Sequence, residues 1–294
     1  MTTHRFTITA EGPFDFGAAL RFVEDWPPTG SLPSDGRALR FAYCAESDWL
    51  PIGVTVTAAP GGVAVATTRA AGPAIRGEVA RILSLDVDGS GFAKLGEADP
   101  MLGELQARNP GLRPVCFWNP WEAACWAVIV QRSSMLIASR LKQRIAERYG
   151  ARVNVDGREY AAFPPPMTLL DAGGLGLPAQ KEEWIRGLAR AALDGALTTE
   201  HLRGLLPDEA LAELRALPGI GPFSAGLILI RGAGAPDVFP GDEPRLFAIL
   251  REAYGLPEDA PLAAYRKVAA AWRPYRSWAS FLFRASAYGA ADER

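Results

Sequence analysis

Three acidic side chains lie close together in the stretch "DVFPGDEP": Asp237, Asp242 and Glu243. A carboxylate in a dry site can stabilise a positive charge that develops during a reaction, or it can activate a water molecule. The same residues have an ordinary structural use, because acids at the start of a helix cap it and complement its dipole. Asp242 as the N-cap and Glu243 in the first turn of a helix over 242–254 would satisfy that second interpretation.

The stretch "LPGIG" over residues 217–221 is a second candidate for chemistry, because it can form a tight turn between two helices. Amphipathic patterns predict helices over 208–216, with Asp208 at the N-cap, and over 222–232. Glycines tolerate positive φ angles, and successive amides at a helix start can bind an anion such as a DNA phosphate. Ile220 would point back into the core. The alternative is an ordinary connection between two helices.

The elements that must position these stretches change in character near residue 100. Before it, apolar and polar residues alternate as in half-buried strands, and "AAPGGVAV" supplies the turn of a hairpin. The predicted strands cover residues 4–11, 39–46, 52–59 and 63–68, and two predicted helices cover 14–25 and 74–85. We therefore expect residues 1–100 to form an α+β domain with an antiparallel sheet.

After residue 100 strands are hard to find, and the pattern is helical. A long amphipathic helix is predicted over 120–150, whereas the segment 160–174 is too rich in proline to be helical. Further helices are predicted over residues 179–194, 261–272 and 275–288. The fold class is thus α+β, with residues 101–294 forming two helical subdomains and a cleft between them.

Composition excludes several classes of protein. The net charge of −2 argues against a broad electrostatic surface for nucleic acid but allows local basic patches. The three cysteines lack metal-ligand spacing, and neither His4 nor His201 lies near a nucleophile motif. The N-terminus has no signal-peptide pattern, and no apolar run reaches membrane-spanning length. We expect a cytoplasmic monomer that has no contact with a membrane.

The order of these motifs resembles the helix-hairpin-helix DNA glycosylases, and within them the bacterial inducible 3-methyladenine glycosylases. The likeness rests on "LPGIG" with the following "DVFPGDEPRL", on "PWEAACWAVIVQRSS", on "GLGLPAQKEEWIRGLARAALDG" and on "WRPYRSWASFLFRAS". The resemblance implies a repair enzyme that flips a damaged base out of double-stranded DNA and hydrolyses its N-glycosidic bond. The alternative is a binder of damaged DNA with the same fold and no turnover.

The resemblance implies a catalytic acid just before the helix that follows the hairpin helix. A count without gaps from Gly221 puts Glu243 on the catalytic aspartate of the family and Asp242 on the acid before it. A glutamate at this position is a departure from the family pattern, and so is Pro244 after it. Asp242 stays the second candidate.

The base pocket that the resemblance implies also departs from the family. Phe22 matches an aromatic residue of that pocket, but Leu227 replaces a tyrosine and Arg284 replaces the tryptophan on which the base stacks. An arginine there would repel a cationic purine, which favours a neutral base, an oxidised base or a bulky adduct. Phe223 stands where strand-cleaving relatives have a Schiff-base lysine, so we expect no lyase activity. Trp126 completes the expected pocket.

The resemblance also implies a DNA-binding surface. In it Arg132 takes the place of the wedge that fills the gap left by the flipped base. The predicted contacts are Gln131, Arg132, Gly219, Ile220, Gly221 and Ser224. No cysteine follows Cys125, so we expect no iron–sulfur cluster. The only ion that the family implies is a monovalent cation held by the hairpin backbone.

Overall fold

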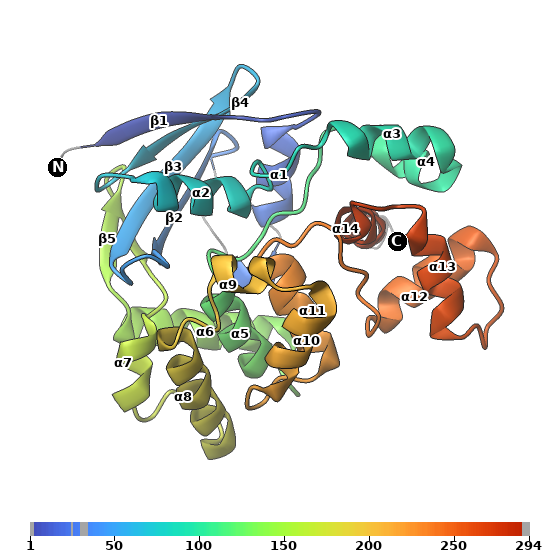
Figure 1. The fold of residues 1–294 in the computed structure, drawn as a ribbon. Helices are drawn as coiled ribbons and strands as arrows, with labels where there is room; N and C mark the ends of the chain where they lie inside the picture. The colour runs from blue at the N-terminus through green and yellow to red at the C-terminus, as the bar shows by residue number, and fades with distance from the viewer. Residues whose placement is uncertain (1–2, 25, 30–34, 290–294) are drawn as a thin grey trace.

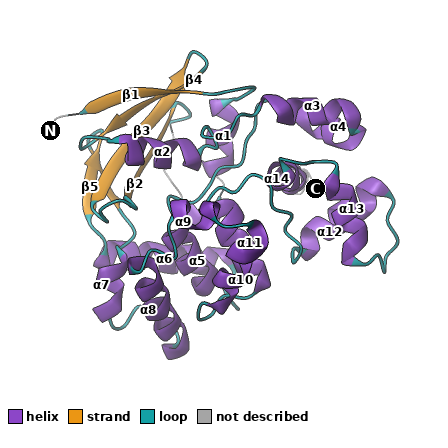
Figure 2. Ribbon diagram, in the orientation of Figure 1, coloured by secondary structure: helices purple, strands orange, loops and turns teal. Residues whose placement is uncertain are grey.

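The computed structural model describes residues 3–24, 26–29 and 35–289 (Figure 1). The last position of the helix predicted over 14–25 lies outside these ranges. Within them the chain forms a sheet with its two covering helices, a helical part in the middle of the sequence, and a second helical part formed mostly by the C-terminal helices (Figures 1 and 2). The predicted α+β class is confirmed.

The N-terminal sheet is antiparallel, with the strand order β1-β4-β3-β2. Its strands are β1 (His4–Thr9), β2 (Ala38–Cys44), β3 (Pro51–Ala59) and β4 (Gly62–Thr67). All four had been predicted, because their side chains alternate between the two faces of the sheet: β1 alternates between half-buried and exposed residues, and β4 between half-buried and buried ones. Helices α1 (Phe16–Glu24) and α2 (Pro73–Ile82) pack against the sheet and share one hydrophobic core with it.

A second hairpin lies where the sequence predicted no strand. It consists of β5 (Arg152–Val155) and β6 (Arg158–Ala161), joined by a turn in which Asp156 and Gly157 both have positive φ. The hairpin packs on β3, where a Cβ at Gly53 would lie 2.5 Å from a methyl group of Val155. The absence of a side chain at Gly53 thus lets the second hairpin cover the sheet.

The middle helical part surrounds α5 (Pro120–Ile129), in which every residue is buried. The other elements of this part are α6 (Met135–Tyr149), α7 (Pro166–Asp171), α8 (Ala179–Leu193), α9 (Thr199–Gly204), α10 (Pro207–Ala216), α11 (Pro222–Leu227) and the π-helical turn η2 (Ile228–Gly232). A short 3-10 turn, η1 (Pro27–Thr29), follows α1 and contacts α6.

Three predictions in this part were wrong. The helix expected over 120–150 is two helices, α5 and α6, and α5 has no polar face because it is surrounded by the core. The proline-rich segment contains the short helix α7, which begins at Pro166, a position where the missing N–H costs nothing. Asp208 is not an N-cap, because α10 begins one residue earlier, with Leu206 as the cap.

The second helical part combines two helices that precede the middle helical part in the sequence with three from the end of the chain. They are α3 (Ser90–Ala98), α4 (Pro100–Arg108), α12 (Pro244–Tyr254), α13 (Leu262–Ala270) and α14 (Arg276–Gly289). One aromatic core joins them, and α14 packs on both α4 and α12 (Figure 1). The expected domain boundary at residue 100 falls between α3 and α4, which touch closely at Gly96 and Gly103.

Candidate active site

The predicted hairpin is a tight turn between α10 and α11. Gly219 has a φ of +77°, and a Cβ on it would lie 2.7 Å from the indole ring of Trp184 on α8. Ile220 is 6% exposed and belongs to the core of the middle helical part, as predicted. Gly221 differs from the expectation, because its φ of −92° is ordinary and a Cβ there would meet nothing within 4 Å. Only the first glycine is required by the fold itself.

The break between α5 and α6 is fastened to this hairpin. The side-chain amide of Gln131 donates a hydrogen bond to the carbonyl oxygen of Gly219 at 2.7 Å. Lys181 on α8 donates to the carbonyl of Ile129 at 2.9 Å and also to that of Gln131. Burial, with a smaller contribution from the charge of Arg132, lowers the pKa of Lys181. A lysine caps the end of α5 and sets the position of the loop.

Arg132 lies in that loop with a φ of +54°, a left-handed conformation that is rare for a residue with a side chain. Its side chain is exposed, as the wedge interpretation requires. The loop ends at Ser134, whose hydroxyl accepts a hydrogen bond from the N–H of Ile137 and begins α6. The structure therefore presents Arg132 to solvent next to the hairpin.

Four further predicted residues have different surroundings. Phe223 is 47% exposed at the start of α11, and Ser224 beside it is buried. Leu227 is partly buried and packs against the core of the middle helical part. Trp126 is 2% exposed within the same core, so it contributes packing there and presents little surface to a ligand.

The three acids after the hairpin helix have three different environments. Asp237 binds Arg276 through both carboxylate oxygens, at 2.7 and 3.1 Å, and its carbonyl accepts from the same guanidinium at 2.7 Å. Asp242 is exposed and does not cap the helix as predicted, because the N-cap position of α12 belongs to Glu243. The Glu243 side chain makes no capping hydrogen bond. Asp237 thus holds α14 in place, whereas the Glu243 side chain neither caps α12 nor pairs with Arg276.

Glu243 faces Arg284 on α14, and the distance from its Oε1 to the Nε of Arg284 is 3.7 Å. The two side chains are 18% and 19% exposed. The structure therefore brings together the predicted catalytic acid and the predicted pocket arginine. The two elements are joined because Leu246 and Leu250 of α12 share a core with Leu282 of α14.

Phe22 reaches the same end of the molecule through an aromatic contact. Its ring packs edge-on against Phe281 at 4.9 Å, and Phe281 lies three residues before Arg284, on the same side of α14. The guanidinium of Arg231 lies over both rings, 5.3 Å from Phe22 and 5.0 Å from Phe281, and 4.2 Å from Trp26. Its Nε donates a hydrogen bond to the carbonyl oxygen of Val115 at 2.8 Å, which fixes the guanidinium there.

Sequence reasoning missed this cluster around Arg231. The arginine stands at the end of the hairpin helix, and no motif or spacing singled it out. The residues that sequence did predict fall into two groups, one around the hairpin and the break after α5, and one around Glu243, Arg284 and Phe22. The two groups are linked along the chain, because Arg231 lies in η2, which directly follows the hairpin helix α11.

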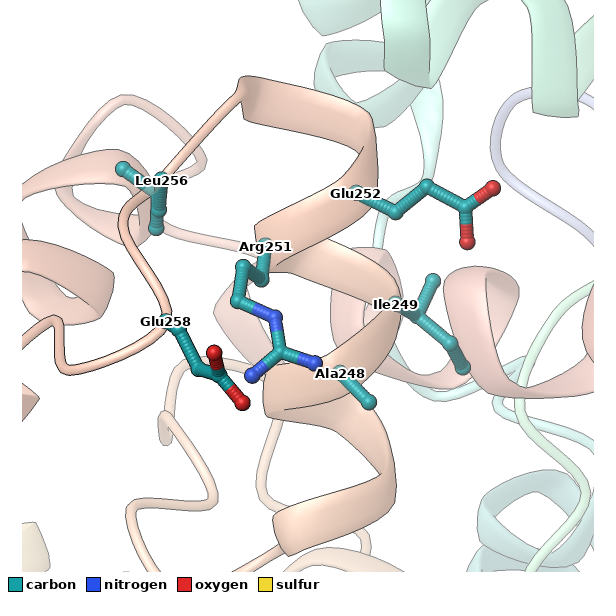
Figure 3. Close-up of a pocket in the computed structure, with 6 residues that line it drawn as sticks. All are labelled: Ala248, Ile249, Arg251, Glu252, Leu256 and Glu258. Carbon is teal, nitrogen blue, oxygen red and sulfur yellow. The ribbon is translucent and has the colours of Figure 1, made fainter.

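A hollow of about 550 Å³ on α12 lies apart from both groups (Figure 3). It is lined by Ala248, Ile249, Arg251, Glu252, Leu256 and Glu258, and Figure 3 shows the side chains of Arg251 and Glu258 pointing toward each other. None of the predicted site residues lines it. Its position assigns it no part in the candidate active site.

The residues that could hold an ion fit only weak ligation. Cys44, Cys116 and Cys125 are separate buried thiols, and burial raises the pKa of Cys44 to about 12. The described residues contain no cluster of three or more metal-binding side chains. At the hairpin the donors are backbone carbonyls such as that of Gly219, whose second lone pair stays available beside the Gln131 hydrogen bond. Such uncharged oxygens suit a monovalent cation, which stays a prediction.

Comparisons with known proteins agree with this geometry. DNA-3-methyladenine glycosylase of Bacillus subtilis (strain 168) is 28% identical over 202 residues, which is 67% of this chain and 67% of that protein. DNA-3-methyladenine glycosylase 2 of Escherichia coli (strain K12) is 35% identical over 184 residues, which is 60% of this chain and 61% of that protein. The matched regions thus span about two thirds of either relative.

A solved structure extends the likeness to the fold of nearly the whole chain. The 3-methyladenine DNA glycosylase from Archaeoglobus fulgidus superimposes with a TM-score of 0.78 at 22% identity, covering 95% of this chain and 96% of that one. No family model matches the chain. In the described part of the chain no helix is long and apolar enough to cross a membrane. By its hairpin, its fold and these relatives, the chain resembles the 3-methyladenine glycosylases of the helix-hairpin-helix DNA glycosylase superfamily.

Proposed function

We propose that this protein is a base-excision repair glycosylase that removes alkylated bases from double-stranded DNA. The observation that carries the proposal is the position of Glu243, whose side chain is mostly buried just before α12 and faces α14, in the register of the family's catalytic acid. Asp237 is occupied by Arg276 and Asp242 is exposed, so Glu243 is the acid suited to the reaction. The names of the relatives support the substrate class.

The chemistry required of Glu243 is electrostatic. A base within the duplex is out of reach, so the nucleotide is rotated into the protein before the bond between sugar and base breaks. The sugar then carries positive charge, which a nearby carboxylate stabilises while water adds to it. Arg284 faces this carboxylate, with its Nε 3.7 Å from Oε1 of Glu243, so an arginine lies beside the acid where the sugar cation would form.

The hairpin and the loop after α5 supply the DNA contacts in this proposal. The amide of Gly221, at the start of the helix that follows, binds a backbone phosphate, whereas the amide of Ile220 donates to the carbonyl of Leu217 within the turn. Arg132 enters the gap that the rotated nucleotide leaves, where a planar guanidinium can stack on the neighbouring bases. The Gln131–Gly219 hydrogen bond keeps the phosphate site and the wedge at a fixed separation.

We also propose that the enzyme leaves an abasic site and does not cut the strand. A lyase needs an amine that forms a Schiff base with the sugar, and Phe223 occupies the position of that lysine. Lys181 is not a substitute, because its ammonium donates to the carbonyls of Ile129 and Gln131. The product is thus expected to be a free base and an intact sugar–phosphate chain.

A second function is favoured by one observation. The positive charge of Arg284 partly offsets the negative charge of Glu243, so the carboxylate stabilises a sugar cation less well than it would alone. A protein that binds damaged DNA and has no turnover would show the same hairpin, wedge and ion pair. The two functions differ in whether a base is released.

Single-turnover assays on a panel of lesion-bearing duplexes decide between them. We expect base release from at least one alkylated duplex, strand breaks only after treatment with hot alkali, and no covalent complex on borohydride trapping. Breaks without alkali together with a trapped complex would contradict the lyase prediction. Tight binding of lesion duplexes with no release on any of them would favour the binder.

A further inference from the structure

One guanidinium group faces the candidate catalytic acid, and a second lies over aromatic rings that include Phe281 of the same helix α14. Arg284 lies 3.7 Å from Glu243, and both side chains are about four-fifths buried. Since Arg284 is a permanent cation, any base that reaches Glu243 enters the field of an ion pair and not that of a lone carboxylate. A positively charged base gains little from a pair whose net charge is close to zero.

The aromatic rings near this pair are already in contact with a cation. Arg231 lies over Phe22 and Phe281 at 5.3 and 5.0 Å, with Trp26 at 4.2 Å. Aromatic faces attract cations through the ring quadrupole, and a guanidinium in that position uses the same attraction. These rings therefore offer a cationic base less than an open aromatic pocket would.

The departing base is affected in the opposite sense. A base that is neutral in DNA takes the electron pair of the N-glycosidic bond and leaves as an anion, unless it gains a proton. A base that is cationic in DNA leaves neutral and needs no such help. The guanidinium of such a pair can still stabilise the anion locally, by donating charge-assisted hydrogen bonds to its acceptor atoms, which a cation does not offer.

We propose that this site selects electrically neutral damaged bases and discriminates against cationic N3- or N7-alkylpurines, with Arg284 as the specificity-determining residue. The inference rests on the proposed function of Glu243. In the step itself the C1′–N bond breaks and its electron pair goes to the base nitrogen. Water adds through oxygen to C1′, and the proton that it loses neutralises the departing base.

The test compares two alkylated lesions of opposite character in the same duplex. One holds 1,N6-ethenoadenine, which is neutral, and the other holds 7-methylguanine, which is cationic. Single-turnover rates of the full chain are divided by the rate of base loss without enzyme, because a cationic base is intrinsically the better leaving group. We expect the enhancement for ethenoadenine to exceed that for 7-methylguanine by about 10-fold or more, from the charge effects at one stabilising group.

Variants of Arg284 then assign the preference to its charge. Arg284→Gln and Arg284→Trp are expected to shift the ratio of the two enhancements toward 7-methylguanine by about 10-fold or more, whereas Arg284→Lys keeps the charge and retains most of the preference. Arg108→Gln is the matched control, because this arginine is exposed on α4 and pairs with Glu104 outside the site. It should leave the ratio unchanged.

The outcomes separate this inference from the proposed function. If the parent protein releases neither base nor any other lesion, the proposed function is wrong and the inference falls with it. If the parent protein releases 7-methylguanine with the larger enhancement, or if Arg284→Gln leaves the ratio at the parental value, the inference is overturned while the glycosylase stands. Thermal unfolding of each variant shows whether it folds, and the Gln and Lys variants suffice if the Trp variant does not.

Discussion

The hairpin (residues 217–221) and the segment 237–243 that contains the three acids, called the acid loop below, are the two halves of the candidate site. They are built in different ways. The hairpin is determined by backbone geometry: Gly219 has a positive φ, sits against Trp184 and accepts a hydrogen bond from Gln131. The acid loop is determined by a pair of side chains, Glu243 and Arg284, at a distance of 3.7 Å. Backbone geometry leaves few residue choices, whereas a side-chain pair can change while the fold stays the same.

The acid loop itself contains a second contrast. Asp237 and Glu243 both face an arginine of α14, but Arg276 binds Asp237 through two side-chain hydrogen bonds and a third to its carbonyl oxygen. Among the described residues, the Glu243 side chain has one ion-pair contact, the longer one to Arg284. Bidentate pairing fixes geometry, and a single longer ion pair leaves a carboxylate able to respond to a substrate. The difference assigns structure to one acid and chemistry to the other.

The largest effect should come from Glu243. Glu243→Gln removes the charge and keeps the shape, so base release should slow by about 10²–10³-fold, as for the loss of one transition-state stabiliser. Binding of a lesion duplex should persist. Single-turnover release and a binding titration on the same duplex measure the two quantities.

Asp242→Asn is the matched control for that experiment. Asp242 is exposed and does not cap α12, so its substitution should leave both the rate and the free energy of unfolding near parental values, within about 0.5 kcal/mol. A rate that collapses with Asp242→Asn and survives Glu243→Gln would mean that the acids have exchanged roles. Parental rates in both variants would remove the chemistry from the acid loop altogether.

The two glycines of the hairpin should separate folding from DNA binding. Gly219→Ala places a Cβ 2.7 Å from Trp184 at a φ of +77°, so it should lower the free energy of unfolding by about 1–3 kcal/mol. Gly221→Ala has an ordinary φ and open space, so it should fold like the parent. If a phosphate approaches the turn, Gly221→Ala should nonetheless weaken duplex binding by about 10-fold, the value of one hydrogen bond.

Chemical denaturation and duplex titration of both glycine variants test this distinction. If Gly221→Ala and the parent bind duplex DNA with equal affinity at low and at moderate salt, no phosphate binds close to the turn. Equal stability of Gly219→Ala and parent would mean that the loop relaxes away from Trp184. In that event the hairpin would be less determined by its backbone than the comparison with the acid loop requires.

The same contrast explains how much of the structure the sequence predicted. The strands and the hairpin turn follow from local patterns, and all four strands of the main sheet were located correctly. The β5–β6 hairpin was missed although its Asp156–Gly157 turn is a strong local signal, because the strands beside it are only four residues each. The break after α5 was missed although Ser134 is a suitable N-cap for α6, because apolar residues continue past the end of α5 to Val130.

The candidate site was predictable as a list of residues but not as an arrangement. Glu243 and Arg284 were each singled out through the family resemblance, yet their contact depends on how α12 packs on α14. The N-cap of α12 was misplaced by one residue because Asp242 is the better cap by type, while Pro244 fixes the first helical position after Glu243. The cluster around Arg231 depends on three separate segments meeting, which no local pattern records.

The smallest effect should come from Arg132, where backbone and side chain can be tested separately. Its φ of +54° costs about 1 kcal/mol for any residue with a Cβ, and that strain is sustained by hydrogen bonds of the neighbouring Gln131, whose side chain donates to the carbonyl of Gly219 and whose own carbonyl accepts from Lys181. The free energy of unfolding of Arg132→Gly should therefore be about 1 kcal/mol higher than that of Arg132→Ala. Both variants lose the guanidinium that fills the gap in the duplex.

If the guanidinium is the wedge, the two variants should slow the fluorescence change of a base analogue opposite the lesion by the same factor, about 3- to 10-fold, despite their different stabilities. Ground-state affinity for undamaged duplex should change less, because a filler acts only after the nucleotide has rotated. Parental fluorescence kinetics in both variants would make Arg132 an ordinary surface residue. A defect in Arg132→Gly alone would instead assign the function to the left-handed backbone, which would place the loop with the hairpin as a feature determined by main-chain geometry.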